Sequence, residues 1–459
     1  MPLAHGSMAN SNYSCTICGN ITSKWSGRCE ACGEWNSISE DIGLSQGPKK
    51  SSLGKSRGSN IPLDDLKSGD KPLVRTKCDL DELDRVLGGG LVPASAILVG
   101  GDPGIGKSTL LLQAAARFAI KGLKTLYISG EEAASQVKLR AKRLNLEASP
   151  IQLGSDTNLR NILTTLETER PKLAIIDSIQ TIWSDKVESA PGTVSQVRAA
   201  AHELTTFAKR SGTSIVLVGH VTKEGQIAGP RVVEHMVDTV LQFEGDRNHV
   251  YRILRSQKNR FGSTNELGIY EMQGNGLREV SNPSEILISK NEEDLSGTAI
   301  SATLEGMRPL MIEIQALVST AVYGTPQRSA TGYNAKRLNM LLAVLEKRAG
   351  FKLGAKDVFL NVTGGITVDD PAIDLAVVAA VLSSNIDISI EKSMCFAAEI
   401  GLAGEVRPVT RVEQRITEAE KLGFKSIVIS KYCKLPKNNY HINIIKVAKV
   451  HDVVKHLFG

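Results

Sequence analysis

The stretch A-I-L-V-G-G-D-P-G-I-G-K-S, residues 96–108, joins an apolar run to a glycine-rich loop. Residues 101–108 fit the pattern G-x-x-x-x-G-K-[ST], in which backbone N–H groups of the loop and of the following helix bind phosphates. The apolar run has the composition of a buried strand, and the amphipathic segment at 108–119 predicts a helix after the loop. This stretch therefore predicts a nucleotide-binding loop at the end of a strand in an α/β fold.

The loop supplies most of the residues predicted to hold a nucleotide. In a loop of this kind the lysine, here Lys107, neutralises the β- and γ-phosphates of ATP, and the hydroxyl of Ser108 ligates Mg²⁺. The predicted nucleotide-binding residues are Gly101, Asp102, Pro103, Gly104, Ile105, Gly106, Lys107, Ser108 and Thr109. ATP and Mg²⁺ are the predicted ligands of this site.

Side chains at the ends of other apolar runs complete the predicted site. Asp177 ends L-A-I-I-D, and an acid at the end of a neighbouring strand is expected to bind Mg²⁺. Glu131, with Glu132 as the alternate, follows T-L-Y-I-S-G and is predicted to orient and polarise the attacking water. Both acids could instead only begin a helix, where acids are favoured. His220 ends S-I-V-L-V-G-H and is predicted to sense the γ-phosphate, although a lone histidine is more often structural.

Short apolar runs alternate with helical patterns over residues 61–285, which predicts a mostly parallel α/β sheet. The predicted buried strands are 96–101, 125–130, 173–178 and 214–220. Beyond residue 240, adjacent strands with tight turns predict hairpins that extend the sheet. A second α/β unit is predicted over 290–459. Its expected strands are 310–318, 357–362, 396–402, 426–430 and 442–447, and its expected helices are 334–349, 371–384 and 411–422.

Composition and charge restrict the class of protein. The 459 residues are 41% apolar and 23% charged, which is ordinary for a globular chain of about two to four domains. The net charge of +6 is compatible with nucleic acid as a partner, while an aromatic content of 4% argues against a large stacking surface. No run approaches the ~18 apolar residues of a membrane helix, and no signal pattern is visible, so a cytoplasmic protein is expected. Residues 1–8 are interpreted as an expression scar.

Four of the seven cysteines form two C-x-x-C pairs separated by ten residues. They are Cys15, Cys18, Cys29 and Cys32. Four thiolates at this spacing favour a structural zinc site over residues 13–37, in preference to unliganded thiols or a redox C-x-x-C. Residues 43–60 are rich in Ser and Gly and carry basic but no acidic side chains, which predicts a flexible basic linker.

The stretch Q-K-N-R-F-G, residues 257–262, contains two cations that would share one face of an extended strand. These cations, Lys258 and Arg260, require an anion, and the residues alone leave three interpretations open. The pair could reach the γ-phosphate of a neighbouring subunit in a ring, as an arginine finger does. It could equally be an exposed cationic strand or a contact to DNA phosphate.

Several motifs together resemble those of the bacterial RadA (Sms) family of DNA-repair ATPases. They are C-x-x-C…C-x-x-C, G-D-P-G-I-G-K-S, I-S-G-E-E, I-I-D-S, V-G-H-V-T-K-E-G and K-N-R-F-G. The resemblance covers essentially the whole chain after residue 8. It implies a RecA-like core that assembles into a homo-hexameric ring, with Lys258 and Arg260 beside a neighbour's nucleotide. It also implies action on single-stranded and branched DNA in homologous recombination, alongside the RecA recombinase.

The same resemblance implies DNA-contacting loops at 184–198 and 222–231, because RecA-like rings line their central channel with such loops. The cations available there are Lys186, Arg198, Lys223 and Arg231. Contacts to phosphate weaken steeply with salt, so DNA affinity should do the same. The alternative for each cation is an ordinary solvated loop charge.

The C-terminal part resembles the peptidase domain of Lon proteases, which uses a Ser–Lys dyad. The serine position corresponds to Ala372 in D-P-A-I-D, and the lysine position aligns with Glu413. Because both roles are vacant, no peptidase activity is expected, and the domain is interpreted as a scaffold of the ring. The helix at 334–349 either contacts DNA or presents a solvated basic face. Its cations are Lys336, Arg337, Lys347 and Arg348.

The sequence thus predicts an α/β protein with a RecA-like P-loop ATPase core, an N-terminal zinc ribbon and a C-terminal Lon-protease-like domain. The predicted function is a DNA-dependent ATPase that acts as a ring-shaped DNA motor in recombination and repair, promoting branch migration. Its predicted cofactors are ATP, Mg²⁺ and Zn²⁺. Two other functions use the same motifs: a nucleotide-switched DNA-binding adaptor without translocation, and a Lon-like ATP-dependent protease, against which Ala372 argues.

Overall fold

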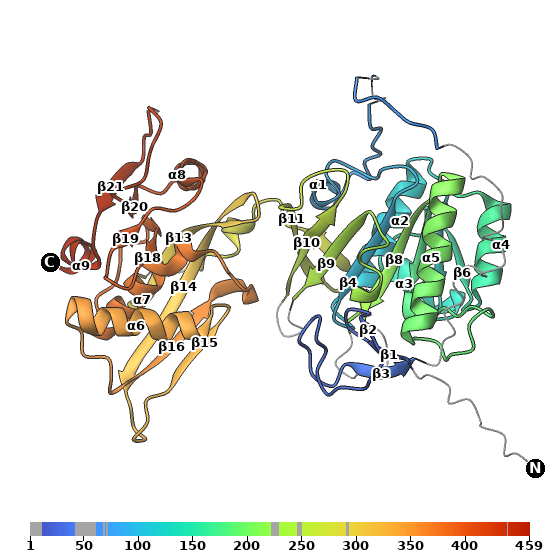
Figure 1. Cartoon of the computed structure of the whole chain (residues 1–459). Coiled ribbons are helices and arrows are strands. Elements are labelled where there is room, and N and C mark those ends of the chain that lie inside the picture. Colours follow the sequence, from blue (N-terminus) through green and yellow to red (C-terminus); the bar gives the residue numbers. More distant parts are fainter. Residues whose placement is uncertain are drawn as a thin grey trace, which may run out of the picture. The chain divides into compact units, whose positions relative to one another are not determined.

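The chain divides into two compact units (Figure 1). The computed structural model describes residues 12–41, 61–67, 69, 72–221, 229–245, 250–290, 293–437 and 439–459. The first unit comprises residues 1–244, 254–264 and 272–278, and the second comprises residues 245–253, 265–271 and 279–459. The predicted scar, the basic linker and Lys223 lie outside the described residues. None of the helices in the described ranges is both long and apolar enough to cross a membrane.

The largest sheet has nine strands in the order β12-β11-β10-β9-β4-β8-β7-β5-β6. Its bounds are β4 (Ala96–Gly101), β5 (Thr125–Ser129), β6 (Gln152–Ser155), β7 (Leu173–Asp177), β8 (Ser214–His220), β9 (Thr239–Glu244), β10 (Tyr251–Asn259), β11 (Leu267–Gln273) and β12 (Gly276–Glu279). The strands from β9 to β6 in this order run parallel. The four predicted buried strands are therefore confirmed, and the last three strands extend the sheet on one side.

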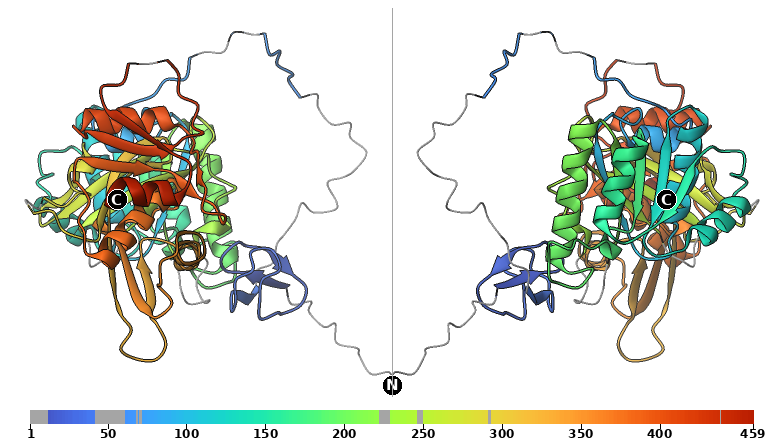
Figure 2. Two further views of the ribbon diagram at one scale, coloured as in Figure 1. Left: turned by 90° about the vertical axis from the view of Figure 1, so that its left-hand side faces the viewer. Right: turned by 90° about the vertical axis from the view of Figure 1, so that its right-hand side faces the viewer.

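Helices cover the parallel strands because each connection along the chain from β4 to β8 carries one. They are α2 (Lys107–Ile120), α3 (Ala134–Arg143), α4 (Leu159–Glu169) and α5 (Val194–Ser211), preceded by α1 (Asp81–Val86). On α5, Val197, Ala201, Leu204 and Ala208 recur at helical spacing and are buried against the strands. Helix α4 packs beside α5, and Figure 2 shows the two together on one side of the sheet. The carboxyl ends of β4, β5, β7 and β8 are thereby left at one common edge.

A small sheet precedes this core. It has the order β2-β1-β3 and consists of β1 (Asn12–Cys15), β2 (Ile21–Thr22) and β3 (Ile38–Asp41). Strand β1 pairs antiparallel with both neighbours, and Cys15 at its end pairs with Ile38. With so few apolar residues, a segment of this size needs a metal or a disulfide to fold stably.

The second unit contains a seven-stranded sheet in the order β15-β16-β14-β13-β17-β20-β21. Its strands are β13 (Thr298–Glu305), β14 (Arg308–Thr320), β15 (Arg328–Thr331), β16 (Lys356–Val362), β17 (Met394–Ala397), β20 (Ser426–Ser430) and β21 (Asn443–Val447). Its helices are α6 (Ala335–Ala349), α7 (Asp374–Ile386), α8 (Val412–Lys421) and α9 (Val450–Phe458). Helix α7 is apolar nearly all round and is buried against β13 and β14, so it forms the centre of this unit.

One strand prediction in this unit is wrong. The expected strand at 396–402 is two separate pieces, because β17 ends at Ala397 and the chain continues into β18 (Glu399–Ile400). Strand β18 pairs with β19 (Val406–Arg407) in a sheet of its own. Between them, the N–H of Ala398 donates to the carbonyl of Ala372 at 3.0 Å, which takes the backbone out of the main sheet.

Candidate nucleotide-hydrolysis site and zinc centre

The glycine-rich loop joins β4 to α2, and its glycines meet a steric requirement. Gly106 caps the start of α2 with φ of 110°, a left-handed conformation that other residues rarely adopt. A Cβ atom at Gly106 would lie 2.6 Å from the Cε atom of Met272, and one at Gly101 would lie 2.5 Å from the carbonyl oxygen of Phe243. The pattern of the sequence therefore reflects close backbone packing, which leaves the N–H groups at the start of α2 available to an anion.

Lys107 lies inside this loop. Its side chain is buried, and Nζ donates to the carbonyl oxygens of Gly101 at 2.6 Å and Asp102 at 2.7 Å. Burial is the main influence on this group and lowers the pKa of Lys107 to about 8. A phosphate beside Nζ would offset that loss of hydration, so the loop is preorganised for an anion.

Asp177 at the end of β7 accepts two hydrogen bonds through one oxygen. Ser108 Oγ and the Tyr127 hydroxyl both donate to its Oδ2 at 2.5 Å. Its Oδ1 is buried and has no hydrogen-bond partner among the described residues. An unpartnered carboxylate oxygen beside a serine hydroxyl is the donor set that Mg²⁺ takes together with substrate phosphates, so these residues fit the predicted metal. The sequence did not predict that Tyr127 contacts Asp177, because this contact depends on β5 lying next to β7.

Glu131 is held by two donors that the sequence did not pair with it. Its Oε1 accepts from Ser178 Oγ at 2.7 Å and lies 2.9 Å from His220 Nε2. The hydrogen bond to His220 is the largest influence on this carboxyl and helps hold its pKa below the usual value. Glu132, the alternate, instead forms an ion pair with Arg140 at 2.6 Å. Both glutamates line the cavity, but Arg140 neutralises the charge of Glu132, whereas Glu131 contacts Ser178 and His220.

A cavity of about 630 Å³ lies at the carboxyl edge of the parallel strands. That volume lies within the range of small-molecule sites, ~300–1,000 Å³. Its lining includes Lys107, Ser108 and Thr109 from α2, together with Glu131 and His220. Oxygens of Glu131 and Asp177 and a nitrogen of His220 all lie within 4.8 Å of one another. The structure thus brings together the loop, Asp177, Glu131 and His220 as the sequence predicted.

Lys258 lies in β10 and Arg260 directly follows that strand, and both are held against the segment that precedes β9. Lys258 Nζ donates to the carbonyl oxygen of Glu234 at 2.9 Å, and Arg260 Nη1 lies 3.2 Å from Asp238 Oδ1. The Arg260 side chain is 45% exposed. Neither cation is among the described residues that line the cavity. The pair is thus not part of the site formed by its own chain.

The predicted DNA contacts have different environments. Lys186 has a side chain that is 70% exposed and lies 3.1 Å from Glu203. Arg198 on α5 is half-buried, and its guanidinium donates to the carbonyl oxygen of Gly19. Arg231 lies in the short 3-10 helix Pro230–Val232 and is exposed. These positions leave Lys186 and Arg231 as accessible cations.

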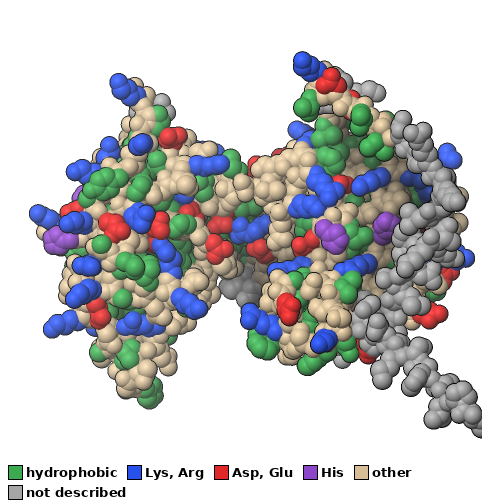
Figure 3. Space-filling model, in the orientation of Figure 1, with side chains coloured by type: hydrophobic (Ala, Val, Ile, Leu, Met, Phe, Trp, Pro, Cys, Tyr) green, Lys and Arg blue, Asp and Glu red, His purple; other side chains and the backbone are tan. Residues whose placement is uncertain are grey.

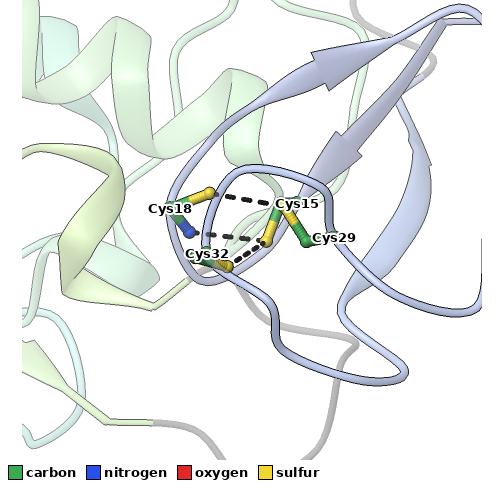
Figure 4. A group of neighbouring side chains, drawn as sticks. All are labelled: Cys15, Cys18, Cys29 and Cys32. Carbon is green, nitrogen blue, oxygen red and sulfur yellow. Dashed lines mark hydrogen bonds between the residues drawn. The ribbon is translucent and has the colours of Figure 1, made fainter.

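The four cysteines converge on one point, as Figure 4 shows. The Sγ atoms of Cys15 and Cys32 lie 3.7 Å apart, and so do those of Cys18 and Cys29. Sulfurs arranged tetrahedrally at ~2.3 Å from Zn²⁺ would be separated by about 3.8 Å. All four ligand positions are filled by protein, so the cluster fits a closed structural zinc site.

Removing the metal is expected to unfold this segment alone. Chelation, or the substitution Cys18→Ser, should release about one Zn²⁺ per chain, because the fourth thiolate is lost. Zinc content and the thermal melting of the whole chain measure the two effects. Cys433→Ser, at a half-buried cysteine of the second unit, is the matched control and should retain the metal. Unfolding of the ATPase core on chelation would contradict a modular zinc ribbon.

The two positions that correspond to the peptidase dyad are occupied in the second unit by residues other than serine and lysine. Ala372 is buried and offers no hydroxyl. Glu413, the residue aligned with the lysine position, is exposed on α8, whereas Arg415 on the same helix is buried. Arg415 Nη1 lies 2.5 Å from Asp370 Oδ2, two residues before Ala372. An arginine paired with a carboxylate cannot serve as a neutral general base.

The basic helix of this unit is also less open than expected. Arg337 on α6 forms an ion pair with the fully buried Asp374 and also reaches Glu399, so it is not a free surface cation. The other three cations of the 334–349 helix stand at exposed positions. On the face in Figure 3, Lys and Arg side chains of this unit are dispersed among acidic ones. That face therefore carries no concentrated basic patch.

The fold and site define a P-loop ATPase that carries a four-cysteine zinc ribbon and a Lon-like domain. Three family models match in the same order: "Rubredoxin metal binding domain" over 13–40, "AAA domain" over 66–226 and "Subunit ChlI of Mg-chelatase" over 313–432. The "DNA repair protein RadA" of Brucella abortus is 47% identical over 450 residues, covering 96% of each chain. That of Bacillus subtilis is 48% identical over 459 residues, covering 98% of this chain and 99% of the relative. The chain belongs to the RadA family of DNA repair proteins.

Proposed function

We propose that this chain is a DNA-dependent ATPase that assembles into a homo-hexameric ring and moves DNA strands in recombination and repair. The observation that carries the proposal is a hydrolysis site whose loop, acids and histidine are assembled, while the cations Lys258 and Arg260 are held outside it. A subunit in a ring would receive these cations from its neighbour, since a head-to-tail interface repeats around a closed ring.

The chemistry proposed for the site follows from its hydrogen bonds. Lys107 and the N–H groups of the loop bind the phosphates of ATP, and Ser108 with Asp177 would hold Mg²⁺, which neutralises charge on the phosphates. Glu131 is fixed through Oε1, and no hydrogen bond from the described residues reaches its Oε2. That oxygen is left to orient the attacking water. A neighbour's Arg260 would stabilise charge on the γ-phosphate in the transition state.

The DNA part of the proposal rests on the family and on the accessible cations. The relatives carry the printed name "DNA repair protein RadA". The two segments expected to face the channel of a ring contain the cations Lys186, Arg231 and Lys223. The proposed nucleic-acid partner is single-stranded or branched DNA. The proposed protein partner is RecA recombinase. The adaptor without translocation remains the second candidate, because it needs the same nucleotide site.

Steady-state ATP hydrolysis with and without single-stranded DNA, at two salt concentrations, tests the proposal. DNA should stimulate hydrolysis, and the stimulation should weaken with salt because phosphate contacts release counterions. Arg231→Ala should reduce the stimulation, whereas Lys209→Ala, at an exposed lysine of α5, serves as the control. ATP-dependent strand displacement would exclude the adaptor. Stimulated hydrolysis without any displacement would favour it.

A further inference from the structure

Gln180 makes two hydrogen bonds to the backbone of a single residue of the hydrolysis site. It lies in the short 3-10 helix Ile179–Thr181, three residues after Asp177, and its side chain is buried. Its Nε2 donates to the carbonyl oxygen of His220 at 2.8 Å, and its Oε1 accepts from the N–H of His220 at 3.2 Å. Both ends of the amide are used, so only one orientation of the side chain satisfies both partners.

These bonds replace strand pairing where the sheet stops. Strand β7 pairs with β8 only as far as Asp177 opposite Val218, whereas β8 continues to His220. On its other side His220 still pairs with Gly101 of β4. Without Gln180, the backbone of His220 would be held from one side only.

The hydrogen bonds of Gln180 bear on catalysis because His220 and Ser178 both contact Glu131. His220 Nε2 and Ser178 Oγ converge on the same oxygen of Glu131, at 2.9 Å and 2.7 Å. Ser178 precedes the 3-10 helix that carries Gln180, so the glutamine ties together the two segments that hold Glu131. His220 Nδ1 is buried and has no partner among the described residues, so the contact to Glu131 is the one the ring makes.

We infer that Gln180 is a positioning residue for ATP hydrolysis: by fixing the backbone of His220, it keeps Glu131 aimed at the attacking water. This inference rests on the proposed hydrolytic function. It assigns no contact between Gln180 and the nucleotide phosphates. Loss of the two hydrogen bonds between Gln180 and His220 should therefore slow the chemical step and leave nucleotide binding intact.

The test is Gln180→Leu, a substitution of similar size that removes both hydrogen bonds. We expect kcat to fall at least about tenfold, a fraction of the ~10²–10⁴ that a positioned acid–base group contributes. The KM for ATP and the affinity for a non-hydrolysable ATP analogue should stay within about twofold, because the loop and Lys107 are unchanged. An equal loss of analogue binding, or an unchanged kcat, would overturn the inference.

Gln196→Leu is the matched control for a purely structural effect. Gln196 is also buried and hydrogen-bonds the backbone of Ser184, Val187 and Ser189, but none of these side-chain bonds reaches Ser178 or His220. It should lower thermal stability as much as Gln180→Leu while retaining most of the basal kcat measured without DNA. If both variants lose kcat in proportion to their stability, Gln180 has no positioning role.

A double-mutant cycle with His220→Ala separates this inference from the proposed function. If Gln180 acts through His220, adding Gln180→Leu to His220→Ala should cause little further loss of kcat. Additive losses, or full activity of His220→Ala alone, would overturn the inference while leaving hydrolysis itself established. A wild-type chain that does not hydrolyse ATP would instead refute the proposed function.

Discussion

Replacing Lys107 with alanine is expected to abolish ATP hydrolysis. The side chain is buried inside the loop, and its ammonium is the only one whose Nζ hydrogen-bonds the loop carbonyls of Gly101 and Asp102 in the described residues. Removing a single preorganised donor to a developing anion costs ~10²–10³ in rate, and Lys107 in addition carries a full charge. We therefore expect a loss of about a thousandfold or more in kcat/KM, measured by phosphate release.

Lys121→Ala is the control for this prediction. Lys121 follows the same helix, α2, and its Nζ lies 2.6 Å from Asp79 at the surface, far along the helix from the loop. An exposed pair of this kind contributes ~0–1 kcal/mol, so both stability and hydrolysis should be close to normal. Substantial turnover in Lys107→Ala would remove the assignment of the phosphate-binding loop.

The sequence was most informative where backbone geometry restricts residue choice. The glycines at 101 and 106 are required by positive φ and close packing, and the thiolates at 15, 18, 29 and 32 by tetrahedral geometry, so both sites left fixed patterns. The family and the three-part α/β fold followed from these patterns and are confirmed by the comparisons.

The sequence was least informative where side chains meet across strands that are distant in the chain. Tyr127 hydrogen-bonds Asp177, Ser178 hydrogen-bonds Glu131, and Gln180 hydrogen-bonds His220. These pairs meet only because the sheet order places β7 between β8 and β5. Nothing in a local pattern encodes that order.

Helix phase explains why Glu413 and Arg415 of the second unit lie in different environments. Residues 413 and 415 are two apart on α8, so a rotation of ~100° per residue places them on nearly opposite faces of the helix. Glu413 consequently faces solvent, while Arg415 is buried and pairs with the half-buried Asp370. A small shift in a sequence alignment thus exchanges the outer face of a helix for its inner face.

Replacing Arg260 with alanine is expected to lose hydrolysis while retaining nucleotide binding. An arginine finger contributes ~10³–10⁵ in rate, and Arg260 lies outside the cavity of its own chain. The fold should persist, because the N–H of residue 260 still donates to the carbonyl of Asp238 at 2.9 Å and Asp238 Oδ2 still accepts from Ala96 N–H at 2.9 Å. Arg255→Ala, at a residue of β10 that pairs with Glu244, is the matched control.

Mixing two inactive variants decides whether Arg260 acts on a neighbour. Arg260→Ala subunits keep a complete loop, and Lys107→Ala subunits keep the finger, so a head-to-tail ring of both contains some complete interfaces. Random assembly of equal amounts would restore about a quarter of the interfaces, with phosphate release as the measurement. Recovery on mixing would support catalysis between subunits and explain why the Q-K-N-R-F-G stretch holds two cations together. If mixing restores nothing while both variants still assemble, the pair must serve DNA or the fold, and the ring mechanism must be withdrawn.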